Sequence, residues 1–564
     1  MYINLLLKAF WFIWMLKYVL FWLYLWQLKE YHIGRFVDHF RTHKGKKLFF
    51  NFIQILKLVL LILFLINGKL FIFLFSILFL VYLGESILFL RGIFNRSIKK
   101  PRKTLKTLFL TAISFAIVIL FLAQVSNLRN LFQPVLLLGF DILTPIIISA
   151  IVLLFQPFFV VLRNNTLRKA RNKIKKIKSV GRLKVIAITG SYGKTSTKEF
   201  LSIILSKKYK VLSTKEHQNS EIGIAKCILQ DLEPSHQIFI AEVGAYNKGK
   251  VKEVCSILKP KIGIVTGVNE QHSALFGSLK NLLLAEGGGE LVEVLSRYNR
   301  GSTTAEPSGP KDGILIVNGD NKYCLDLYKR SDVNKKIYSL SNKTIDSDIW
   351  SDDITVYKNY VSFLATNKSG ELAHFDVKVL GKQNVQNLLG AILAAKELGM
   401  SLGEISEVCK DISQEQAGMT LKQGKHGINI IDSSYSANPD GVLADLDYLK
   451  IFTGNPPSPE CYGREKKVIV MPCLIELGDK SAEIHEKIGK KIAEVCDLAI
   501  ITSKDRFKEL KKGALEVGMS EKDILLCDNP QDIYSMITLF CKSGDAVLLE
   551  GRVPQKLTEL LVVS

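Results

Sequence analysis

The sequence predicts an α-helical transmembrane region at the N-terminus, followed by an α/β region with a P-loop-type central domain and a Rossmann-like C-terminal domain. Three observations support this fold class. The first 162 of the 564 residues contain five long apolar stretches. From residue 185 onward, apolar strand-like runs alternate with amphipathic helical patterns. A glycine-rich turn with lysine and hydroxyl residues, TGSYGKTST, ends the first of those strands.

The apolar stretches cover roughly residues 5–27, 49–67, 70–90, 107–126 and 135–162. Each approaches or exceeds the roughly 20 residues that a helix needs to cross a bilayer. The first stretch carries four tryptophans and two lysines, and no small-residue cleavage site follows it. We therefore interpret it as a spanning helix and not as a signal peptide. A helix lying in the membrane interface is the alternative.

Positive charge alternates between the connecting segments. Residues 28–48 hold six Lys and Arg, 91–106 hold seven and 163–184 hold ten, whereas 67–69 and 127–134 hold one each. Lys and Arg accumulate on the cytoplasmic side of a membrane. Five spans with this alternation place the N-terminus outside and the later domains in the cytoplasm. We expect a multi-pass protein of the cytoplasmic (inner) membrane.

The net charge of +22 arises entirely in the N-terminal third. Residues 1–184 carry 28 Lys and Arg against 4 Asp and Glu, whereas residues 185–564 carry 47 against 49. The near-neutral remainder argues against nucleic acid as a partner. The basic run at 163–178 is best explained as a juxtamembrane helix on anionic lipid. The nine scattered cysteines include no C-x-x-C pair, which indicates reduced thiols and no zinc site.

Three ionisable residues, Lys57, Glu85 and Asp141, lie within the apolar stretches. Ionisable groups at membrane depth often mark function. A helix-packing or snorkelling role explains them at least as well, so we assign them no chemistry.

Composition shifts divide the chain into four segments. They are transmembrane helices in 1–162, a basic juxtamembrane linker in 163–184, a central domain in 185–412 and a C-terminal domain in 413–564. Alternating polarity in 343–380 predicts a small additional sheet. The connection near 413–419 is the expected hinge between the last two domains.

The turn after the first strand is a shortened form of the phosphate-binding loop G-x-x-x-x-G-K-[ST]. Glycines let backbone N–H groups wrap phosphate oxygens, and the N-terminus of the next helix adds partial positive charge. Lys194 would reach the β- and γ-phosphates, and Thr195 would hold Mg²⁺. A plain glycine turn is the alternative. The residues assigned to nucleotide binding in this turn are Gly190, Ser191, Gly193, Lys194, Thr195 and Ser196.

Two further candidate residues also follow apolar strands. Glu242 follows the run 238–241, and His272 lies beyond the run 262–265. In an open parallel sheet, both would emerge at the carboxyl edge beside the glycine loop. Carboxylate and imidazole ligands suit Mg²⁺ or Mn²⁺, although histidine is unusual for Mg²⁺. We expect Glu242 and His272 to be metal ligands together with Thr195. A structural histidine is the alternative for His272.

Seven motifs, in order along the chain, resemble those of the Mur ligase family. The sixth of these motifs favours the MurF branch, and so does the segment Phe276-Gly277-Ser278, which follows the third motif. The motifs are the loop T-G-x-x-G-K-T, AEVGA at 241–245, TGVNEQH at 266–272, NGDN at 318–321, GKQNVQN at 381–387, DSSYSANP at 432–439, and ELG at 476–478 followed by His485.

The resemblance covers about residues 183–564 and implies an ATP-dependent, ADP-forming amide ligase. The MurF branch uses ATP and Mg²⁺ to add D-alanyl-D-alanine to UDP-N-acetylmuramoyl-tripeptide. The resemblance implies nucleotide contacts for Asn318 and Asp320, and places Asp432 and Asn438 on the C-terminal side of the cleft. The expected partners are a UDP-linked or lipid-linked wall precursor and an amino acid or dipeptide. Membrane lipid and other wall-synthesis proteins are further expected partners.

The chain departs from the family at three places. The family has a lysine, often carbamylated, after F-G-S, but AEGGGEL at 285–291 has none. Counting forward places Glu286 at that position, and counting back from Glu290 places Gly288 there. We expect Glu286 to supply a carboxylate to the reaction in place of the carbamate. The family arginine before the C-terminal domain is missing from 416–419, and Gln383 replaces a histidine.

These departures leave two alternatives to a MurF-type ligase. One is a catalytically impaired nucleotide-binding scaffold for wall synthesis at the membrane. The other is a membrane-bound poly-amino-acid ligase, which keeps the chemistry and changes the product.

Overall fold

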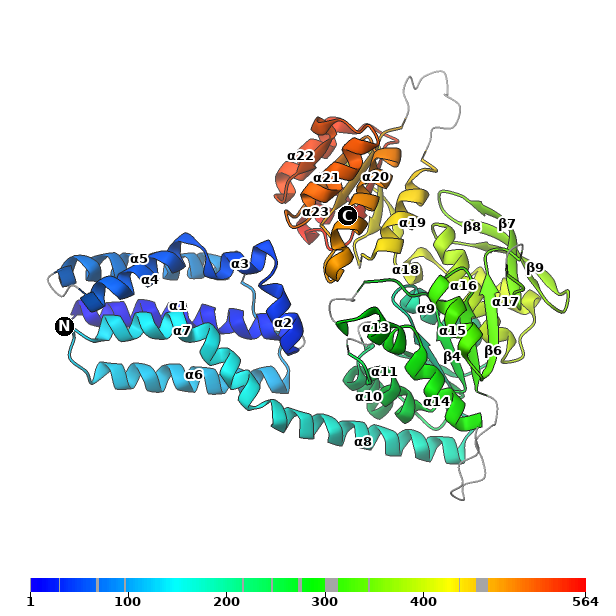
Figure 1. The fold of residues 1–564 in the computed structure, drawn as a ribbon, viewed down its shortest axis with the longest axis horizontal. Coiled ribbons are helices and arrows are strands. Elements are labelled where there is room, and N and C mark those ends of the chain that lie inside the picture. The colour runs from blue at the N-terminus through cyan, green and yellow to red at the C-terminus, as the bar shows by residue number, and fades with distance from the viewer. Residues whose placement is uncertain are drawn as a thin grey trace. The chain divides into compact units, whose positions relative to one another are not determined.

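The computed structural model separates the chain into two compact units, Met1–Asn164 and Asn165–Ser564 (Figure 1). It describes residues 2–29, 31–66, 70–95, 98–215, 218–244, 247–271, 276–299, 313–342, 345–435, 437–452 and 465–563.

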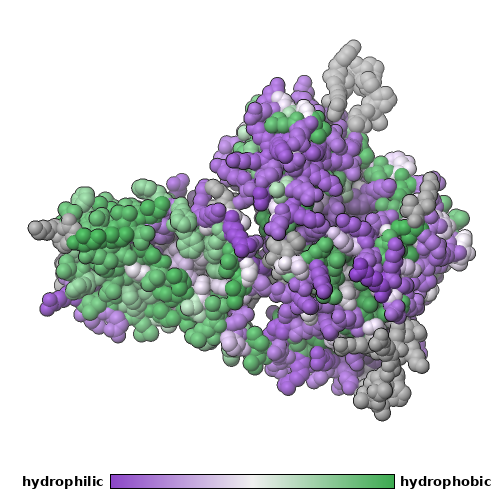
Figure 2. Space-filling model, in the orientation of Figure 1, coloured by the Kyte–Doolittle hydropathy of each residue, from purple (hydrophilic) through white to green (hydrophobic). Residues whose placement is uncertain are grey.

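The first unit is a bundle of helices with an apolar surface (Figure 2). Five described helical segments are long and apolar enough to cross a membrane: α1, the segment Gly45–Ile66 that contains α4, and α5, α6 and α7. This agrees with the five predicted stretches, although α7 ends before residue 162. The helices are α1 (Tyr2–Leu28), α2 (Ile33–His39), α3 (His43–Phe49), α4 (Phe52–Ile66), α5 (Phe71–Phe94), α6 (Leu105–Ser126) and α7 (Gln133–Leu154).

Helix α1 lies inside this bundle, against α5, α6 and α7. Its tryptophans are internal: Trp11, Trp22 and Trp26 are at most 2% exposed. The indole Nε1 of Trp11 donates to the carbonyl oxygen of Leu137 at 3.0 Å, and that of Trp26 donates to Ser149 Oγ at 3.1 Å. The aromatic residues of the first stretch therefore form the bundle core, as expected of a helix surrounded by other helices.

The three ionisable residues of the apolar stretches meet in one buried cluster. Lys57 Nζ lies 2.7 Å from Glu85 Oε2 and 2.6 Å from Asp141 Oδ2. Trp14 and Tyr82 also donate hydrogen bonds to the Asp141 carboxylate, at 3.2 and 3.0 Å. The cluster joins α1, α4, α5 and α7, which fits the helix-packing role.

Helix α8 (Gln156–Val180) contains most of the segment expected to be a linker. In its second half, Leu167, Ala170, Ile174 and Ile177 are buried in the core that α10 and α11 share. Lys173 and Lys178 donate hydrogen bonds to backbone carbonyls of the same domain. This half of α8 is therefore a structural helix of the second unit, and its apolar side is not available to lipid.

The central domain has a nine-stranded sheet in the order β2-β3-β1-β4-β5-β6-β7-β8-β9. Strands β1 to β7 run parallel, and β8 and β9 continue antiparallel. The chain leaves β1 toward one edge and returns to pair β4 on its other side, so β1 is the switch point where open α/β sheets bind ligands. The strands are β1 (Lys184–Thr189), β2 (Val211–Ser213), β3 (Ile238–Glu242), β4 (Ile262–Val265), β5 (Ile314–Asn318), β6 (Asn334–Ser339), β7 (Ile349–Val356), β8 (Val361–Asn367) and β9 (Leu372–Val377).

Helices cover both faces of this sheet because its strands are apolar on both sides. One core contains α9, α16 and α17, and the other contains α8, α10, α11, α13, α14 and α15. The helices are α9 (Lys194–Ser206), α10 (Glu221–Gln230), α11 (Lys250–Leu258), α13 (Leu279–Ala285), α14 (Gly289–Asn299), α15 (Lys322–Arg330), α16 (Lys382–Lys396) and α17 (Leu402–Cys409).

The small sheet expected in 343–380 is not separate. Strand β7 pairs in parallel with the end of β6, through Tyr338↔Ile349 and Ser339↔Trp350, so β7–β9 extend the main sheet. Alternating polarity predicted the strands correctly, but pairing partners depend on tertiary contacts that the pattern does not contain.

The C-terminal domain has a six-stranded sheet in the order β10-β11-β15-β12-β13-β14, parallel except for β10. Helices α19, α20 and α21 cover one face, and α22 and α23 cover the other. The elements from the hinge onward are α18 (Gln414–Ala417), β10 (Thr420–Gln423), β11 (Asn429–Ser433), α19 (Pro439–Leu449), β12 (Lys467–Met471), α20 (Ser481–Val495), β13 (Leu498–Ile501), α21 (Phe507–Glu516), β14 (Ile524–Leu526), α22 (Pro530–Phe540), β15 (Ala546–Glu550) and α23 (Gln555–Leu561).

Candidate active site

The glycine loop joins β1 to α9 at the switch point of the central sheet. Gly190 and Gly193 have φ of 136° and 76°, which L side chains rarely adopt. A Cβ atom would come within 2.5 Å of Thr266 Oγ1 at Gly190, and within 2.3 Å of Asn387 Oδ1 at Gly193. Gly193 also caps α9 without a side-chain bond, which leaves the first N–H groups of the helix open to an anion.

Lys194 lies over this loop. Its Nζ donates to the carbonyl oxygens of Gly190 at 2.5 Å and Ser191 at 3.3 Å. The ammonium is thus held at the place where the loop would wrap a phosphate, and it can exchange backbone carbonyls for phosphate oxygens. Ser196 instead turns toward the hinge, where its hydroxyl donates to the carbonyl oxygen of Ala417 at 3.1 Å.

Thr195 and Glu242 meet beside the loop. Thr195 Oγ1 lies 3.0 Å from Glu242 Oε2, and the ladder pairs Glu242 with Ile188 of β1. Asn219 Nδ2 donates to Glu242 Oε1 at 3.2 Å, and the buried Lys198 ammonium lies 3.6 Å from Oε2. A hydroxyl and a carboxylate at one point suit Mg²⁺, which prefers oxygen ligands. The residues present therefore fit that ion.

Glu286 faces the same loop from the end of α13. It is 2% exposed, and its Oε2 accepts a hydrogen bond from Ser191 Oγ at 3.0 Å. Ser191 Oγ also accepts from the backbone N–H of Asn269 at 3.2 Å. Glu290 serves elsewhere, since its carboxylate caps the first N–H groups of α11 at Gly249 and Lys252.

The glycines after Glu286 break the helix between α13 and α14. Gly288 has φ of 86°, and a Cβ atom there would come within 2.6 Å of Val265 Cγ2. Of the two alignments that the sequence left open, the turn presents the side chain of Glu286 to the loop, while Gly288 has none to offer.

Asn318 is the last residue of β5, and Asp320 lies two residues beyond it. Asn318 is fully buried, and its Nδ2 donates to the carbonyl oxygen of Thr266 at 2.8 Å. Gln386 Nε2 donates to Asn318 Oδ1 at 3.1 Å and to Asp320 Oδ2 at 2.9 Å. Asp320 also accepts from the backbone N–H of Leu340 at 2.8 Å. Asn318 therefore holds the β4 segment, and Asp320 holds the segment after β6.

The C-terminal domain contacts this site through Asn438, which caps α19. The side-chain amide of Asn269 donates to Asn438 Oδ1 at 3.0 Å and to Asp440 Oδ2 at 2.9 Å. The next two residues also cross between domains: Glu270 lies 2.7 Å from Lys480, and Gln271 Nε2 donates to the carbonyl oxygen of Ala437 at 3.0 Å.

Asp432 contacts its own domain. Lys422 Nζ lies 2.6 Å from Asp432 Oδ2, and Ser434 donates to Oδ1 at 2.5 Å. Burial raises the pKa of the Asp432 carboxyl, but the hydrogen bonds from Lys422 and Ser434 outweigh burial and leave it below its usual value. Asp432 is therefore ionised at neutral pH, and its described hydrogen bonds lie within the C-terminal domain.

The remaining predicted ligand, His272, lies outside the described residues. Four polar residues that sequence reasoning missed belong to the site: Lys198, Asn219, Asn269 and Gln386. Lys198 follows Thr195 by one helical turn, and Asn269 and Gln386 lie within the motifs quoted above, so these three residues could have been predicted from the sequence. Asn219 could not, because it lies outside the motifs and approaches Glu242 from the loop before α10.

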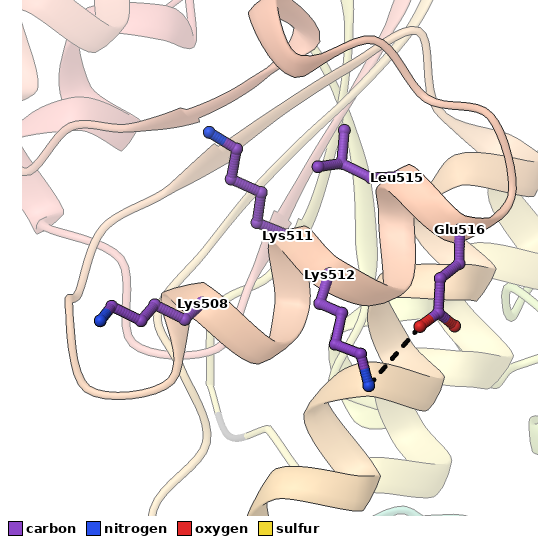
Figure 3. A pocket seen from close by; sticks show the side chains of 5 residues that line it. All are labelled: Lys508, Lys511, Lys512, Leu515 and Glu516. Carbon is purple, nitrogen blue, oxygen red and sulfur yellow. Dashed lines mark ion pairs between the residues drawn. The ribbon is translucent and has the colours of Figure 1, made fainter.

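An open hollow of about 550 Å³ lies on another part of the molecule, along α21 (Figure 3). It is lined by Lys508, Lys511, Lys512, Leu515 and Glu516. Lys512 pairs with Glu516 at 3.5 Å, and Lys511 pairs with Glu521 at 2.5 Å. None of the residues described above contributes to this hollow.

A glycine loop at the switch point of a parallel sheet, with a hydroxyl–carboxylate pair beside it, defines a P-loop nucleotide-binding protein. A second, Rossmann-like domain borders that loop. Two family models match these domains: the Mur ligase middle domain over residues 188–395, and the Mur ligase glutamate ligase domain over residues 419–553. The chain belongs to the Mur ligase family.

Several known proteins are similar to this chain in sequence. The UDP-N-acetylmuramoyl-tripeptide–D-alanyl-D-alanine ligase of Synechocystis sp. is 26% identical over 318 residues, which cover 55% of this chain and 59% of that relative. The ligase of the same description from Bacillus subtilis is 24% identical over 388 residues, covering 67% and 75%. That from Borreliella burgdorferi is 31% identical over 310 residues, covering 54% and 59%. The chain thus spans less than two thirds of the first and third relatives.

Solved structures share the fold. MurF from Acinetobacter baumannii has a TM-score of 0.58 at 21% identity, covering 71% of this chain and 80% of its own. MurF ligase from Thermotoga maritima in complex with ADP has a TM-score of 0.58 at 21% identity, covering 71% and 83%. These likenesses agree with the predicted α/β fold of residues 185–564.

Proposed function

We propose that this chain is a membrane-anchored, ATP-dependent and ADP-forming ligase that joins an amine to a carboxyl group of a cell-wall precursor. The observation that carries the proposal is the 3.0 Å contact between Thr195 and Glu242 beside the glycine loop. A loop alone binds phosphate, whereas a loop with an adjacent oxygen-ligand pair provides for a metal-bound nucleotide.

The residues divide the work by position. The loop glycines and the N-terminus of α9 bind the phosphates, and Lys194 moves from loop carbonyls to the β- and γ-phosphates. Thr195 and Glu242, with His272, would hold Mg²⁺, which neutralises phosphate charge when bound. Glu286 bonds to Ser191 and can thereby orient the glycine loop around the phosphates and the magnesium ion. Asn318 and Asp320 would contact the nucleotide. Asn438 and Asp432 would border the nucleotide from the C-terminal domain.

Amide formation needs a leaving group on the carboxyl, and ATP supplies one as an acyl phosphate. The substrate carboxylate attacks the γ-phosphate, and the amine then displaces phosphate, so no protein nucleophile is required. Exclusion of water protects the acyl phosphate from hydrolysis. The contacts from residues 269–271 to the C-terminal domain support a closed arrangement that does this.

For the substrates, we propose D-alanyl-D-alanine or a similar amine, and a wall precursor linked to UDP or to lipid. The relatives with that description and the DSSYSANP motif support this choice. The five apolar helices and the alternating loop charge support an inner-membrane location with the N-terminus outside. Membrane lipid and other wall-synthesis proteins are the partners that such a location offers.

The test measures phosphate release by the full chain in detergent, with ATP, Mg²⁺ and UDP-linked or lipid-linked precursor, with and without D-Ala-D-Ala. We expect amine-dependent release of ADP and phosphate. Lys194→Ala should abolish it, and the exposed Lys207→Ala on the far end of α9 should not. Activity that persists without Lys194 would contradict the site assignment.

A nucleotide-binding scaffold is the second candidate. It is favoured by the replacement of the family lysine by Glu286 and by the absence of an arginine from 416–419. A scaffold would bind ATP with the same Lys194 dependence but release no phosphate with any amine. A poly-amino-acid ligase would release phosphate repeatedly on one acceptor, because each product would accept a further amino acid.

A further inference from the structure

Lys106 lies at the start of α6, where three segments of the helical bundle meet. It is partly buried, and its Nζ lies 3.7 Å from the centre of the Tyr31 ring and 4.7 Å from the centre of the Phe159 ring. It also donates a hydrogen bond to Gln156 Oε1 at 3.3 Å. Tyr31 follows α1, whereas Gln156 and Phe159 belong to the start of α8. Two aromatic rings and one amide therefore hold this ammonium in place.

The described acidic residues of the first unit have other cationic partners. They are Asp38, Glu85 and Asp141. The first pairs with Arg41 at 3.3 Å, and the other two pair with Lys57. Within the described part of the chain, Lys106 thus has no ion pair. Aromatic rings stabilise a partly buried cation only in part, because a charge removed from water also requires an opposite charge.

The backbone around Lys106 is fixed to α1. Gln27 Nε2 donates to the carbonyl oxygen of Arg102 at 3.0 Å, and the backbone N–H of Arg102 donates to Gln27 Oε1 at 2.6 Å. Thr104 then caps α6, because its Oγ1 accepts from the backbone N–H of Thr107 and its own N–H donates to Thr107 Oγ1. A ligand at Lys106 would therefore meet an ordered segment.

This end of the bundle is strongly basic. The contact of Gln27 with Arg102 places the segment 91–106 beside the end of α1, from which the segment 28–48 continues. The first of these segments contains seven Lys and Arg and no acidic residue, and the second contains six against two. Basic residues beside a membrane attract lipids with anionic head groups.

The surface beside the ammonium is apolar. Leu105, Phe109 and Phe158 are 88%, 38% and 51% exposed. The ring of Phe109 lies 6.0 Å from that of Phe158 and 5.9 Å from that of Phe159, over which Lys106 lies. A cation and an exposed apolar surface thus meet at one ring. This combination matches a molecule with an anionic head and an apolar tail.

We propose that Lys106 binds the phosphate group of an anionic lipid, whose tail lies along Phe109 and Phe158. The inference rests on the membrane location in the proposed function, and it does not depend on ligase activity. The shared chemistry is a phosphate on an apolar chain. It has two sources, a bulk phospholipid such as phosphatidylglycerol and an isoprenoid phosphate of the kind that carries a lipid-linked precursor.

The test measures lipid binding to the full chain in a neutral detergent by native mass spectrometry. The lipids are phosphatidylglycerol, a polyprenyl phosphate and, as the zwitterionic control, phosphatidylcholine. Wild type should bind an anionic lipid about 5-fold more tightly than phosphatidylcholine, the preference expected from one lysine near anionic lipid. Lys106→Ala and Lys106→Gln should both remove this preference, whereas Lys106→Arg should retain it.

Matched variants separate a site from diffuse attraction. Lys103→Ala removes an exposed charge from the same end of the bundle, and Lys8→Ala removes a partly buried lysine from the start of α1. Both should keep the preference for anionic lipid. Tyr31→Leu removes the ring beside the ammonium and should weaken the preference, whereas Tyr31→Phe should keep it.

Three results would overturn the inference: wild type without a preference for anionic lipid, an equal loss in Lys103→Ala and Lys106→Ala, or displacement of the lipid by inorganic phosphate at the same concentration. Tighter binding of the polyprenyl phosphate would support the inference and assign the carrier lipid as its source. Equal binding, or tighter binding of phosphatidylglycerol, would support it and assign bulk lipid.

The measurement also separates this inference from the proposed function, because it needs neither ATP nor turnover. A chain that releases phosphate with an amine but shows no preference for anionic lipid contradicts only the lipid site. A chain that binds anionic lipid through Lys106 but releases no phosphate with any amine contradicts only the ligase.

Discussion

At the residue scale, the glycine loop depends on two positions where no other side chain fits. Gly190 and Gly193 combine positive φ with contacts under 3 Å for any Cβ atom. Their replacement would displace Thr266 or Asn387, which border the loop. The pattern of glycines in the sequence was sufficient to find this loop, because the requirement for glycine is local.

Glu286 provides a prediction about catalysis. Glu286→Gln keeps the shape of the side chain and removes its charge beside Ser191, so kcat should fall about 10- to 100-fold, as for other groups that orient a metal site. Steady-state phosphate release measures this effect. The partly exposed Glu293→Gln on α14 is the control and should retain wild-type kcat. An unchanged kcat in Glu286→Gln would assign the residue to the packing of the turn alone.

Glu550 provides a prediction about pH. Its pKa is raised in the folded protein by burial and by Asp445, so the folded state binds a proton that the unfolded state releases. This contribution to stability is fully present below the ordinary glutamate pKa and is lost as pH rises toward the raised folded value. Glu550→Gln, which is always neutral, should therefore raise the Tm at pH 8 and change it little at pH 4.5. Equal effects at both pH values would contradict the assignment of this proton.

At the element scale, helices take roles that their composition alone does not reveal. Half of α8 packs into the central domain with Ile174 and Ile177 buried, although its many basic residues suggested a lipid-bound linker. The aromatic α1 is the interior of its bundle. In α8 the apolar stripe decides the packing in spite of the basic residues, whereas in α1 the tryptophans themselves form the core.

The buried ionic cluster of the bundle gives a prediction about stability. Lys57→Ala leaves Glu85 and Asp141 without their cation, and such a loss from a buried pair costs about 3–5 kcal/mol. Thermal unfolding of the purified chain in detergent should show the bundle melting earlier. The exposed Lys103→Ala should have no such effect. Replacing all three members by neutral residues (Lys57→Met, Glu85→Gln, Asp141→Asn) should restore much of the loss, and failure to do so would indicate a role beyond packing.

At the scale of the whole molecule, the segment after β4 connects the glycine loop to the C-terminal domain. Asn269, Glu270 and Gln271 each reach a residue of that domain, and the backbone of Asn269 is held by Ser191. Burial raises the pKa of the Glu270 carboxyl, but hydrogen bonds from Lys480 and Tyr323 lower it further, to a net value below the usual one. The pair of Glu270 with Lys480 is therefore ionised and joins the two domains.

Charge reversal tests this contribution. Glu270→Lys or Lys480→Glu places like charges together and should shift the domains toward an open arrangement, which increases the radius of gyration in small-angle scattering. The double reversal restores the pair and should restore closure. Because Lys480 is 54% exposed, the coupling should be at the scale of about 0.2–1 kcal/mol and should weaken at high salt. Additive single effects would show that the pair does not act as a latch.

The sequence by itself determined the division into an apolar helical part and an α/β part, the place of the glycine loop, and the order of the strand-end residues. These follow from local periodicity and from the rule that parallel strands end at one edge. Only the tertiary structure decided that Glu286 faces the loop, that Lys198 and Asn219 hold Glu242, and that β7–β9 extend the main sheet. Those facts depend on contacts between segments far apart in the chain, whose register and packing no local pattern specifies.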